Sequence, residues 1–346
     1  MKKLLYIVSA AVLTACVSSK ETANTTDNNN TVDYAAKYAE TITAKDLGKH
    51  LFIYASDEFE GRNTGEPGQK KAVKYLKDFY VSKGIVSPLG GDDYFQEVPS
   101  EYLSNNRRGM QLKDSENVVA FIKGTEKPDE IIVISAHLDH EGVKDGEIYN
   151  GADDDGSGTV AILEIAEAFK QAADAGKGPK RSILFLHVTG EEKGLLGSKY
   201  YTENPIFPLA NTVSNLNIDM IGRVDDRHKG NPNYVYLIGS DKLSTELHNI
   251  SEAMNKKYMN IDLDYKYNDE NDPNRFYYRS DHYNFAKHNI PIIFYFNGTH
   301  ADYHKPTDTP DKINYEMLEN RTRLVFYTAW EVANRENRVV VDKAAK

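Results

Sequence analysis

The chain has 346 residues, of which 42 are Lys or Arg and 52 are Asp or Glu, so its formal net charge is −10. This acidic balance argues against nucleic acid as a partner, because binding a phosphate backbone requires a surplus of cations. The length allows one large α/β domain or two small ones, and 40% hydrophobic residues can form a sizeable core.

The N-terminus has the layout of an export signal. Lysines at positions 2 and 3 precede the apolar segment Leu4–Leu13, which is too short to span a bilayer. The segment ends in Leu13–Cys16 (LTAC), which resembles the lipobox of bacterial lipoproteins. This resemblance implies a lipoprotein signal peptide over residues 1–15 and an exported bacterial lipoprotein, at the periplasmic face or cell surface, held to the membrane through lipidated Cys16. The alternative is an ordinary cleavage site with an incidental cysteine.

A flexible tether is expected over residues 16–42, because Val17–Val32 is rich in Ser, Thr and Asn and has almost nothing to bury. A single catalytic domain is then predicted over residues 43–346. Its first helix is expected over Thr43–Ser56. A second helix begins at Pro67, which is favoured at a first helical position, and ends at Gly84.

Apolar runs bounded by turn residues predict the strands of a sheet. The expected strands are Tyr94–Val98, Asn117–Lys123, Ile131–Ser135, Ser182–Thr189, Thr212–Asp219, Tyr234–Gly239 and Pro291–Phe296. Helical segments are expected over Thr159–Phe169, Gly190–Tyr201, Lys242–Tyr258, Arg279–His288 and Asn314–Asn334. This alternation predicts an α/β fold, a mostly parallel mixed sheet sandwiched by helices.

The central stretch joins a buried strand to residues that suit a metal site. After the apolar run Ile131–Ser135 the chain changes at once to His137, Asp139 and His140. Open α/β folds keep their sites at the carboxyl ends of such strands. Three consecutive acids, Asp153–Asp155, follow beside glycines. Because adjacent carboxylates repel one another, their placement in a folded core predicts a cation.

Polar clusters also follow the later strands. They are Glu191 with Glu192, Asp219, and His304 in the loop after the last strand. Taken singly, such residues are usually structural, since glutamates at a helix start favour the helix dipole and an Asp after a strand often forms a turn. Together with the central stretch, they lie where strands release into loops, and we infer that they converge on one edge of the sheet.

In content and order, these motifs resemble those of the M28 family of zinc peptidases, the co-catalytic aminopeptidase family. The motifs are Ala136–Asp139 (AHLD), Gly151–Gly158 (GADDDGSG), Gly190–Ser198 (GEEKGLLGS), Asn217–Met220 (NIDM), Arg279–His282 (RSDH) and Tyr303-His304. The resemblance covers about residues 45–338. It implies the zinc-exopeptidase (phosphorylase/hydrolase-like) fold.

The resemblance further implies two Zn²⁺ ions per chain. Asp154 would bridge the two ions. His137 and Asp219 would complete one position, and Glu192 and His304 would complete the other. Imidazole and carboxylate are ordinary zinc ligands, and catalytic zinc sites keep one position open.

Other roles carried by the resemblance concern catalysis. Glu191 would be the general acid/base, and Asp139 would be the acceptor that orients His137. Tyr303 would donate to the oxyanion, and Arg279 would clamp a carbonyl oxygen of substrate or product.

The predicted function is a di-zinc metallopeptidase that hydrolyses peptide bonds by removing N-terminal residues from peptides. A glutaminyl cyclase-like acyltransferase with a single zinc, a dipeptidase or carboxypeptidase of the same family, and a surface binding protein without catalysis stay open as alternatives. The resemblance also predicts a cis peptide bond between Asp154 and Asp155.

Overall fold

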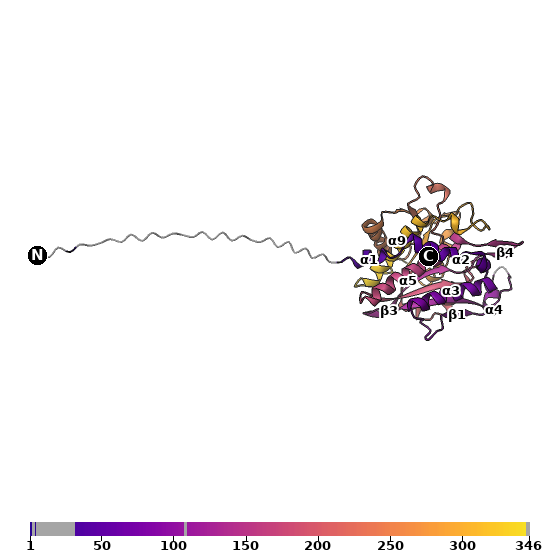
Figure 1. Ribbon diagram of the computed structural model, residues 1–346, viewed down its shortest axis with the longest axis horizontal. Helices are drawn as coiled ribbons and strands as arrows, with labels where there is room; N and C mark the ends of the chain where they lie inside the picture. Colours follow the sequence, from indigo (N-terminus) through magenta and orange to yellow (C-terminus); the bar gives the residue numbers. More distant parts are fainter. Residues whose placement is uncertain (2–3, 5–31, 107–108, 344–346) are drawn as a thin grey trace. The chain divides into compact units, whose positions relative to one another are not determined.

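An eight-stranded mixed sheet organises the part of the chain that the computed structural model describes, which comprises Met1, Leu4 and residues 32–106 and 109–343 (Figure 1). Its strand order is β1-β2-β6-β3-β7-β10-β8-β9. The strands are β1 (Phe95–Val98), β2 (Ser115–Ile122), β3 (Lys127–His137), β6 (Arg181–Val188), β7 (Thr212–Ile218), β8 (Tyr234–Ile238), β9 (Asp262–Asp264) and β10 (Ile292–Phe296). A separate hairpin pairs β4 (Gly142–Lys144) with β5 (Glu147–Tyr149).

The middle of the sheet is parallel. β3 pairs in parallel with both β6 and β7, and β7 pairs in parallel with β10. Antiparallel pairs, β2 with β6 and β10 with β8, flank this parallel centre. From Ile131 to His137 every residue of β3 is buried, as expected for a strand covered by helices on both faces. The predicted fold class is therefore confirmed.

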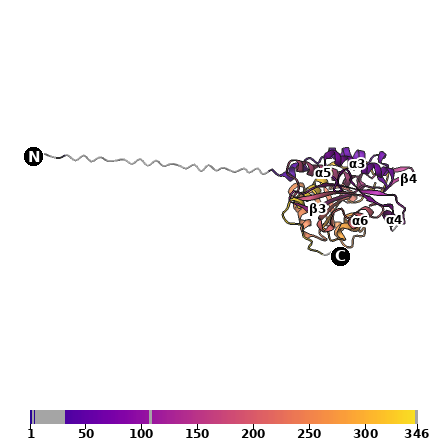
Figure 2. The same ribbon diagram turned by 90° about the horizontal axis from the view of Figure 1, so that it is seen from below.

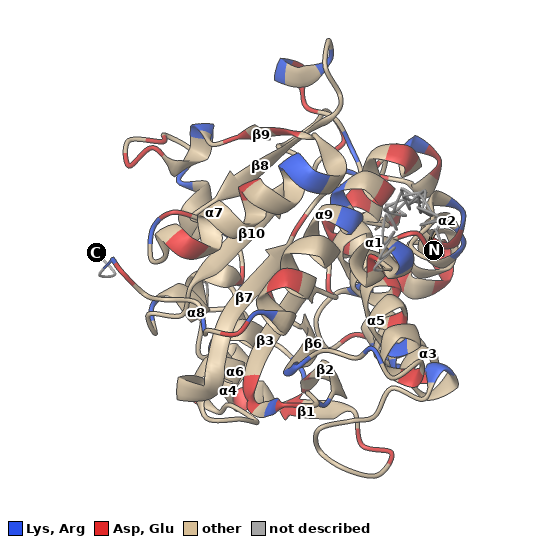
Figure 3. Ribbon diagram, turned by 90° about the vertical axis from the view of Figure 1, so that its left-hand side faces the viewer, with Lys and Arg blue, Asp and Glu red and all other residues tan. Residues whose placement is uncertain are grey.

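Helices cover both faces of the sheet. Figure 2 shows α3 and α5 on one side of the strands and α4 and α6 on the other. The larger core packs the sheet against α1 (Tyr34–Ala39), α2 (Ala44–Tyr54), α3 (Pro67–Lys83), α5 (Gly158–Asp174), α7 (Thr245–Met254) and α9 (Tyr315–Asn334). The opposite face carries α4 (Ser100–Ser104), α6 (Leu196–Glu203) and α8 (His282–Ala286). Figure 3 shows charged residues mainly on the outer helices and loops, while the central strands carry few.

Local capping explains where the predicted helices begin and end. Thr43 caps α2 by accepting a hydrogen bond from the backbone N–H of Asp46. Pro67 opens α3, and Gly84 ends it in the left-handed conformation with φ 65°. Asn314 caps α9 in the same way as Thr43 caps α2. These boundaries lie within two residues of the predicted ones.

The start of the folded unit differs from the prediction. Residues 33–42 were expected to belong to the tether, but the compact unit begins at Asp33 and includes α1. The ring of Tyr38 stacks on Trp330 with centroids 6.0 Å apart, and Ala39 is fully buried. A six-residue helix without Leu or Ile has little periodic signal, and its burial depends on α9, far away in sequence.

The predicted lipobox with Cys16 and most of the predicted signal peptide and tether lie outside the described residues. Among the residues that the structure does describe, no helix is both long enough and apolar enough to cross a bilayer.

Candidate metal centre

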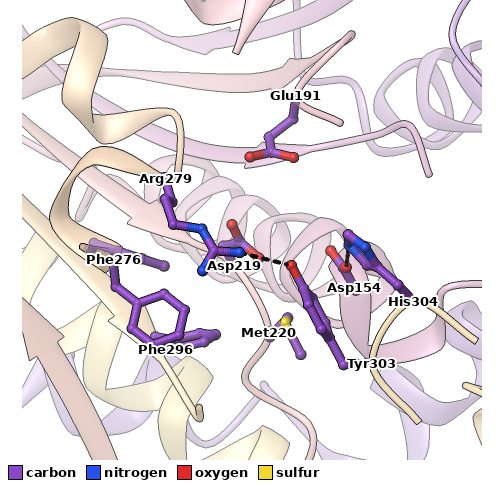
Figure 4. Close-up of a pocket in the computed structure, with 10 residues that line it drawn as sticks. Asp154, Glu191, Asp219, Met220, Phe276, Arg279, Phe296, Tyr303 and His304 are labelled. Atoms are coloured by element: carbon purple, nitrogen blue, oxygen red, sulfur yellow. Dashed lines mark hydrogen bonds and ion pairs between the residues drawn. The ribbon is translucent and has the colours of Figure 1, made fainter. Parts of the chain in front are cut away.

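Four strand ends and one helix start deliver the candidate ligands to a single edge of the sheet. β3 ends in His137, β7 is followed by Asp219, and the loop after β6 carries Glu192. The loop after β10 carries His304, and Asp154 precedes α5. Because β3, β6, β7 and β10 run parallel, their carboxyl ends meet, and Figure 4 shows Asp154, Asp219 and His304 around one pocket.

The first donor group consists of His137, Asp154 and Asp219. The Nε2 atom of His137 lies 3.2 Å from Asp154 Oδ1 and 3.6 Å from Asp219 Oδ1. On its other side, His137 Nδ1 lies 3.0 Å from the backbone carbonyl oxygen of Asp139. A bond from Nδ1–H to this carbonyl leaves the Nε2 lone pair facing the two carboxylates.

The second donor group shares Asp154 with the first. His304 Nε2 lies 2.9 Å from Asp154 Oδ2 and 3.3 Å from Glu192 Oε2. His140 Nδ1 lies 2.9 Å from Glu192 Oε1, and His140, Asp154 and Glu192 form a further group that could hold a metal ion. The two oxygens of Asp154 thus face different imidazoles, which is the arrangement that a bridging carboxylate requires.

The donor atoms fit metal ions better than they fit one another. His137 Nε2, Asp154 Oδ2 and both ring nitrogens of His140 are buried without a hydrogen-bond partner, although oppositely charged atoms lie nearby. An unpaired buried polar atom costs about 1–3 kcal/mol. Several such atoms facing one gap indicate a shared cation, and nitrogen with carboxylate oxygen is the donor set that zinc prefers.

Neighbouring groups shift the pKa values of two candidate ligands, Asp154 and His304, in opposite directions. Burial and Glu192 would raise the pKa of Asp154, but His137 and His304 lower it well below its ordinary value. Burial lowers the pKa of His304, but Asp154 and Glu192 override this effect and raise it to about 10. Without a cation in the gap, a protonated imidazole balances the carboxylates; bound zinc would take over that positive charge, and His304 would bind it as the neutral imidazole.

The carboxylates of Asp153 and Asp155 do not face this gap. Asp153 Oδ1 accepts from Gly222 N at 2.6 Å, and its Oδ2 lies 3.1 Å from His300 Nε2. Asp155 accepts from the backbone N–H groups of Gly158 at 2.9 Å and Met220 at 3.0 Å. Of the three consecutive acids, Asp154 alone faces the gap, because backbone N–H groups hold Asp155 and one oxygen of Asp153. The peptide bond between Asp154 and Asp155 is cis, as predicted.

Asp139 faces His137 Nδ1 as an acceptor, and it does so through its main-chain carbonyl. Its carboxylate lies 4.0 Å from His137 Nδ1, and the main-chain carbonyl takes the close position. The carboxylate instead accepts from Thr64 Oγ1 at 2.7 Å and from the backbone N–H of Glu191 at 3.1 Å. Asp139 therefore holds the Glu191 backbone in place, a role that only the approach of two loops reveals.

Glu191 points toward the gap from the opposite side of the pocket (Figure 4). Burial raises the pKa of its carboxyl well above the ordinary value; His137 opposes this shift, and Glu192 and Asp219 add to it. A carboxyl group that faces the gap in this way can accept a proton and later return it.

An apolar recess adjoins the donor groups. Phe276, Phe294, Phe296 and Met220 line it beside Arg279 and Tyr303. The guanidinium Nη2 of Arg279 lies 3.5 Å from the Tyr303 hydroxyl, so both reach the rim of the same pocket. These aromatic residues carried no distinct sequence signal, because they also read as ordinary core.

His140 is the residue to which sequence reasoning gave no role. It stands three positions after His137, in the run His137-Leu138-Asp139-His140, where three of four residues have side chains that can bind a metal. That run is the signal that could have found it.

Comparisons with known proteins agree with this geometry. Residues 117–329 match the family model described as Peptidase family M28. Leupeptin-inactivating enzyme 1 of Streptomyces exfoliatus is 27% identical over 303 residues, which are 81% of this chain and 59% of that protein. The chain thus spans about three fifths of the length of this relative.

Solved structures show the same fold. The Legionella pneumophila LapA aminopeptidase aligns with a TM-score of 0.65 and 21% identity, covering 88% of this chain and 75% of that one. The aminopeptidase from Aneurinibacillus sp. strain AM-1 aligns with a TM-score of 0.64 and 17% identity, covering 90% and 98%.

Proposed function

The chain belongs to peptidase family M28, and from this membership we propose that it is a zinc-dependent aminopeptidase that removes residues from the N-termini of peptides. The observation that carries the proposal is the pair of donor groups that share Asp154, with Glu191 facing them across a pocket. The relatives named as aminopeptidases support it.

The ligands would be His137, Asp154 and Asp219 at one zinc and Asp154, Glu192 and His304 at the other. Bound there, zinc would polarise the scissile carbonyl and make water a stronger nucleophile at neutral pH.

The remaining chemistry falls to side chains of the pocket. Glu191 accepts a proton from the attacking water at its carboxylate and passes it to the leaving amine. The Tyr303 hydroxyl, at the pocket rim, donates to the oxyanion that develops on the carbonyl oxygen. The recess formed by Phe276, Phe294 and Phe296 receives an apolar side chain and excludes water from the reacting bond.

Carboxypeptidase or dipeptidase action is the second candidate, and Arg279 is the observation that favours it. Its guanidinium stands at the pocket rim, where a substrate carboxylate could form a charge-assisted pair. A glutaminyl cyclase-like enzyme with one zinc is less favoured, because the site presents two donor groups.

A peptide mixture tests the proposal. The zinc-loaded protein is incubated with matched peptides that have a free N-terminus, an acetylated N-terminus or an amidated C-terminus, and the products are read by mass spectrometry. Aminopeptidase action removes residues from the first and third sets and spares the acetylated set. Cleavage that requires a free C-terminus would contradict the proposed aminopeptidase action and indicate carboxypeptidase action instead.

We also propose that the protein is an exported lipoprotein anchored through Cys16. The export-like layout of residues 1–15 and the LTAC run support this. Cys16→Ala should leave the precursor unprocessed or the protein unanchored, as measured by membrane fractionation. A processed variant that still fractionates with membranes would contradict the anchor.

A further inference from the structure

The candidate metal centre contains one more imidazole than the resemblance implies. His140 follows β3 and is fully buried. Its Nδ1 lies 2.9 Å from Glu192 Oε1 and 3.8 Å from Asp154 Oδ2. These are the two carboxylates that His304 also approaches, and the His140 and His304 rings lie edge to face with centroids 5.7 Å apart.

Each of the other buried histidines of the described chain has a hydrogen-bond partner on one ring nitrogen. His187 lies 2.7 Å from the Tyr80 hydroxyl, and His282 lies 2.8 Å from the carbonyl oxygen of Tyr277. By contrast, neither ring nitrogen of His140 makes an aligned hydrogen bond. Burying two ring nitrogens without hydrogen bonds costs free energy, and packing alone would not offset this cost. A cation between Nδ1 and the carboxylates would remove part of it.

The surroundings hold the His140 ring in this orientation. Gly151 has φ 54°, and a Cβ at that position would lie 2.5 Å from Cγ and Cδ2 of the ring. The backbone N–H of His140 donates to the carbonyl oxygen of Arg62 at 3.3 Å. Both the close approach of the Gly151 backbone and the fixed main chain aim Nδ1 at Glu192.

We propose that His140 is a fourth protein ligand of the metal position formed by Asp154, Glu192 and His304. The inference rests on the proposed zinc peptidase function and deepens it, because the two positions then differ in kind. Zinc sites with four protein ligands are closed and hold the ion for structural purposes, whereas catalytic sites with three keep a position open.

The open position is then the one at His137, Asp154 and Asp219, which offers three protein donors. Asp219, Asp154 and His304 line the pocket with Glu191, whereas His140 and Glu192 lie behind it. With one more protein ligand, the four-donor position is expected to retain its zinc longer than the three-donor position.

Zinc release into a chelator measures this difference directly. The mature protein is loaded with two zinc ions per chain and mixed with an excess of a chromogenic chelator. The wild type is expected to release zinc in two phases of equal amplitude. His140→Gln should accelerate the slow phase at least about 10-fold, since losing even an indirect partner of a zinc ligand costs about 10–100-fold in affinity.

His187→Gln is the matched control, because it makes the same change at a fully buried histidine that hydrogen-bonds to Tyr80. It should leave both phases unchanged. His140→Cys supplies a thiolate, which zinc also binds, and should keep a slow phase near that of the wild type. If His140 served only for packing, cysteine would not be expected to restore slow zinc release. The Cys variant therefore tests the proposal even if the Gln variant does not fold.

Two results would overturn the inference while leaving the proposed function intact. One is a His140→Gln variant whose two release phases match the wild type. The other is a folded His140→Cys variant that loses its slow phase. A wild-type protein that binds no zinc and cleaves no peptide would instead remove the proposed function, and the inference with it.

Discussion

Adjacent acidic residues in this protein have different roles, and the role of each depends on its hydrogen-bond partners. Asp153 and Asp155 accept from backbone N–H groups of neighbouring loops, so Asp154 alone turns both oxygens to the imidazoles. Glu191 and Glu192 divide in the same way. The first lines the pocket, and the second lies against His140 and His304.

The division between the two glutamates can be tested by amide substitution. Glu191→Gln cannot accept a proton, so kcat should fall by at least about 10²–10⁴-fold while zinc content stays at the wild-type level. Glu192→Gln should lower zinc content, because a neutral amide is a poor zinc ligand. Zinc per chain and kcat are measured together for both variants. If Glu191→Gln loses zinc and Glu192→Gln keeps it, the two roles are exchanged.

Arg62 is a second residue whose role comes from its partners. It is fully buried, and its guanidinium donates to the carbonyl oxygens of Leu138 at 3.1 Å, Tyr54 at 3.1 Å, Asn150 at 2.7 Å and Gly151 at 2.9 Å. It therefore ties the loop after β3 to the loop before α5, the two segments that carry His137 and Asp154.

Arg62→Met should lower the free energy of unfolding by at least about 3 kcal/mol, because each carbonyl left buried without a donor costs about 1–3 kcal/mol. Chemical denaturation measures this loss. The control is Arg227→Met, because the Arg227 side chain is 57% exposed and pairs with Asp264, and it should change stability by less than about 1 kcal/mol. Equal stability of both variants would show that the loops hold together without the guanidinium.

At the scale of elements, the helix layer contains a buried carboxyl group that opposes folding at neutral pH. Glu164 of α5 is buried, with Oε1 3.6 Å from Nε2 of His50 in α2. Burial, together with Glu167 and Asp46, raises its pKa from 4.5 to about 8. In the unfolded chain this carboxyl ionises near its ordinary pKa, so between these values the unfolded state releases a proton that the folded state keeps.

The free energy of unfolding should therefore fall as pH rises from about 4.5 to 8, by on the order of 3 kcal/mol at pH 7. Glu164→Gln does not titrate, so its stability relative to the wild type should rise through that window. Denaturation midpoints at pH 5, 6, 7 and 8 give the slope. The exposed Glu316→Gln serves as control, with the wild-type slope. A Glu164→Gln variant with that same slope would contradict the assignment.

For the whole molecule, the metal centre joins segments from both halves of the chain. His137 and Asp154 come from the first half, and Asp219 and His304 from the second. A ligand that binds only the folded state stabilises it by about 4 kcal/mol at 1,000 times its Kd. Bound zinc should therefore hold the fold together as well as support catalysis.

Removal of zinc with a chelator should lower the melting temperature, and readdition should restore it in proportion to the logarithm of free zinc. Differential scanning calorimetry at fixed free zinc measures the shift. Asp154→Asn, which removes the shared carboxylate, should melt at nearly the same temperature with and without zinc. A wild-type melting temperature that does not respond to zinc would argue against occupied sites.

The sequence by itself determined the α/β class, most element positions and the candidate ligands at strand ends. Buried strands and capped helices have local signatures of periodicity, β-branching and punctuating residues such as Pro67 and Gly84. The order of the ligand motifs along the chain was sufficient to identify the family, which the family model then matched.

Tertiary structure alone decided which atoms meet. Whether Asp139 acts through its carboxylate or its carbonyl, whether α1 joins the fold, and where His140 points all depend on segments distant in the chain. A side chain's role follows from its partners in space, and residues such as Arg62 and His140 obtain these from loops that only the folded sheet brings together. Sequence periodicity indicates burial and local geometry, but it does not indicate which distant side chains come into contact.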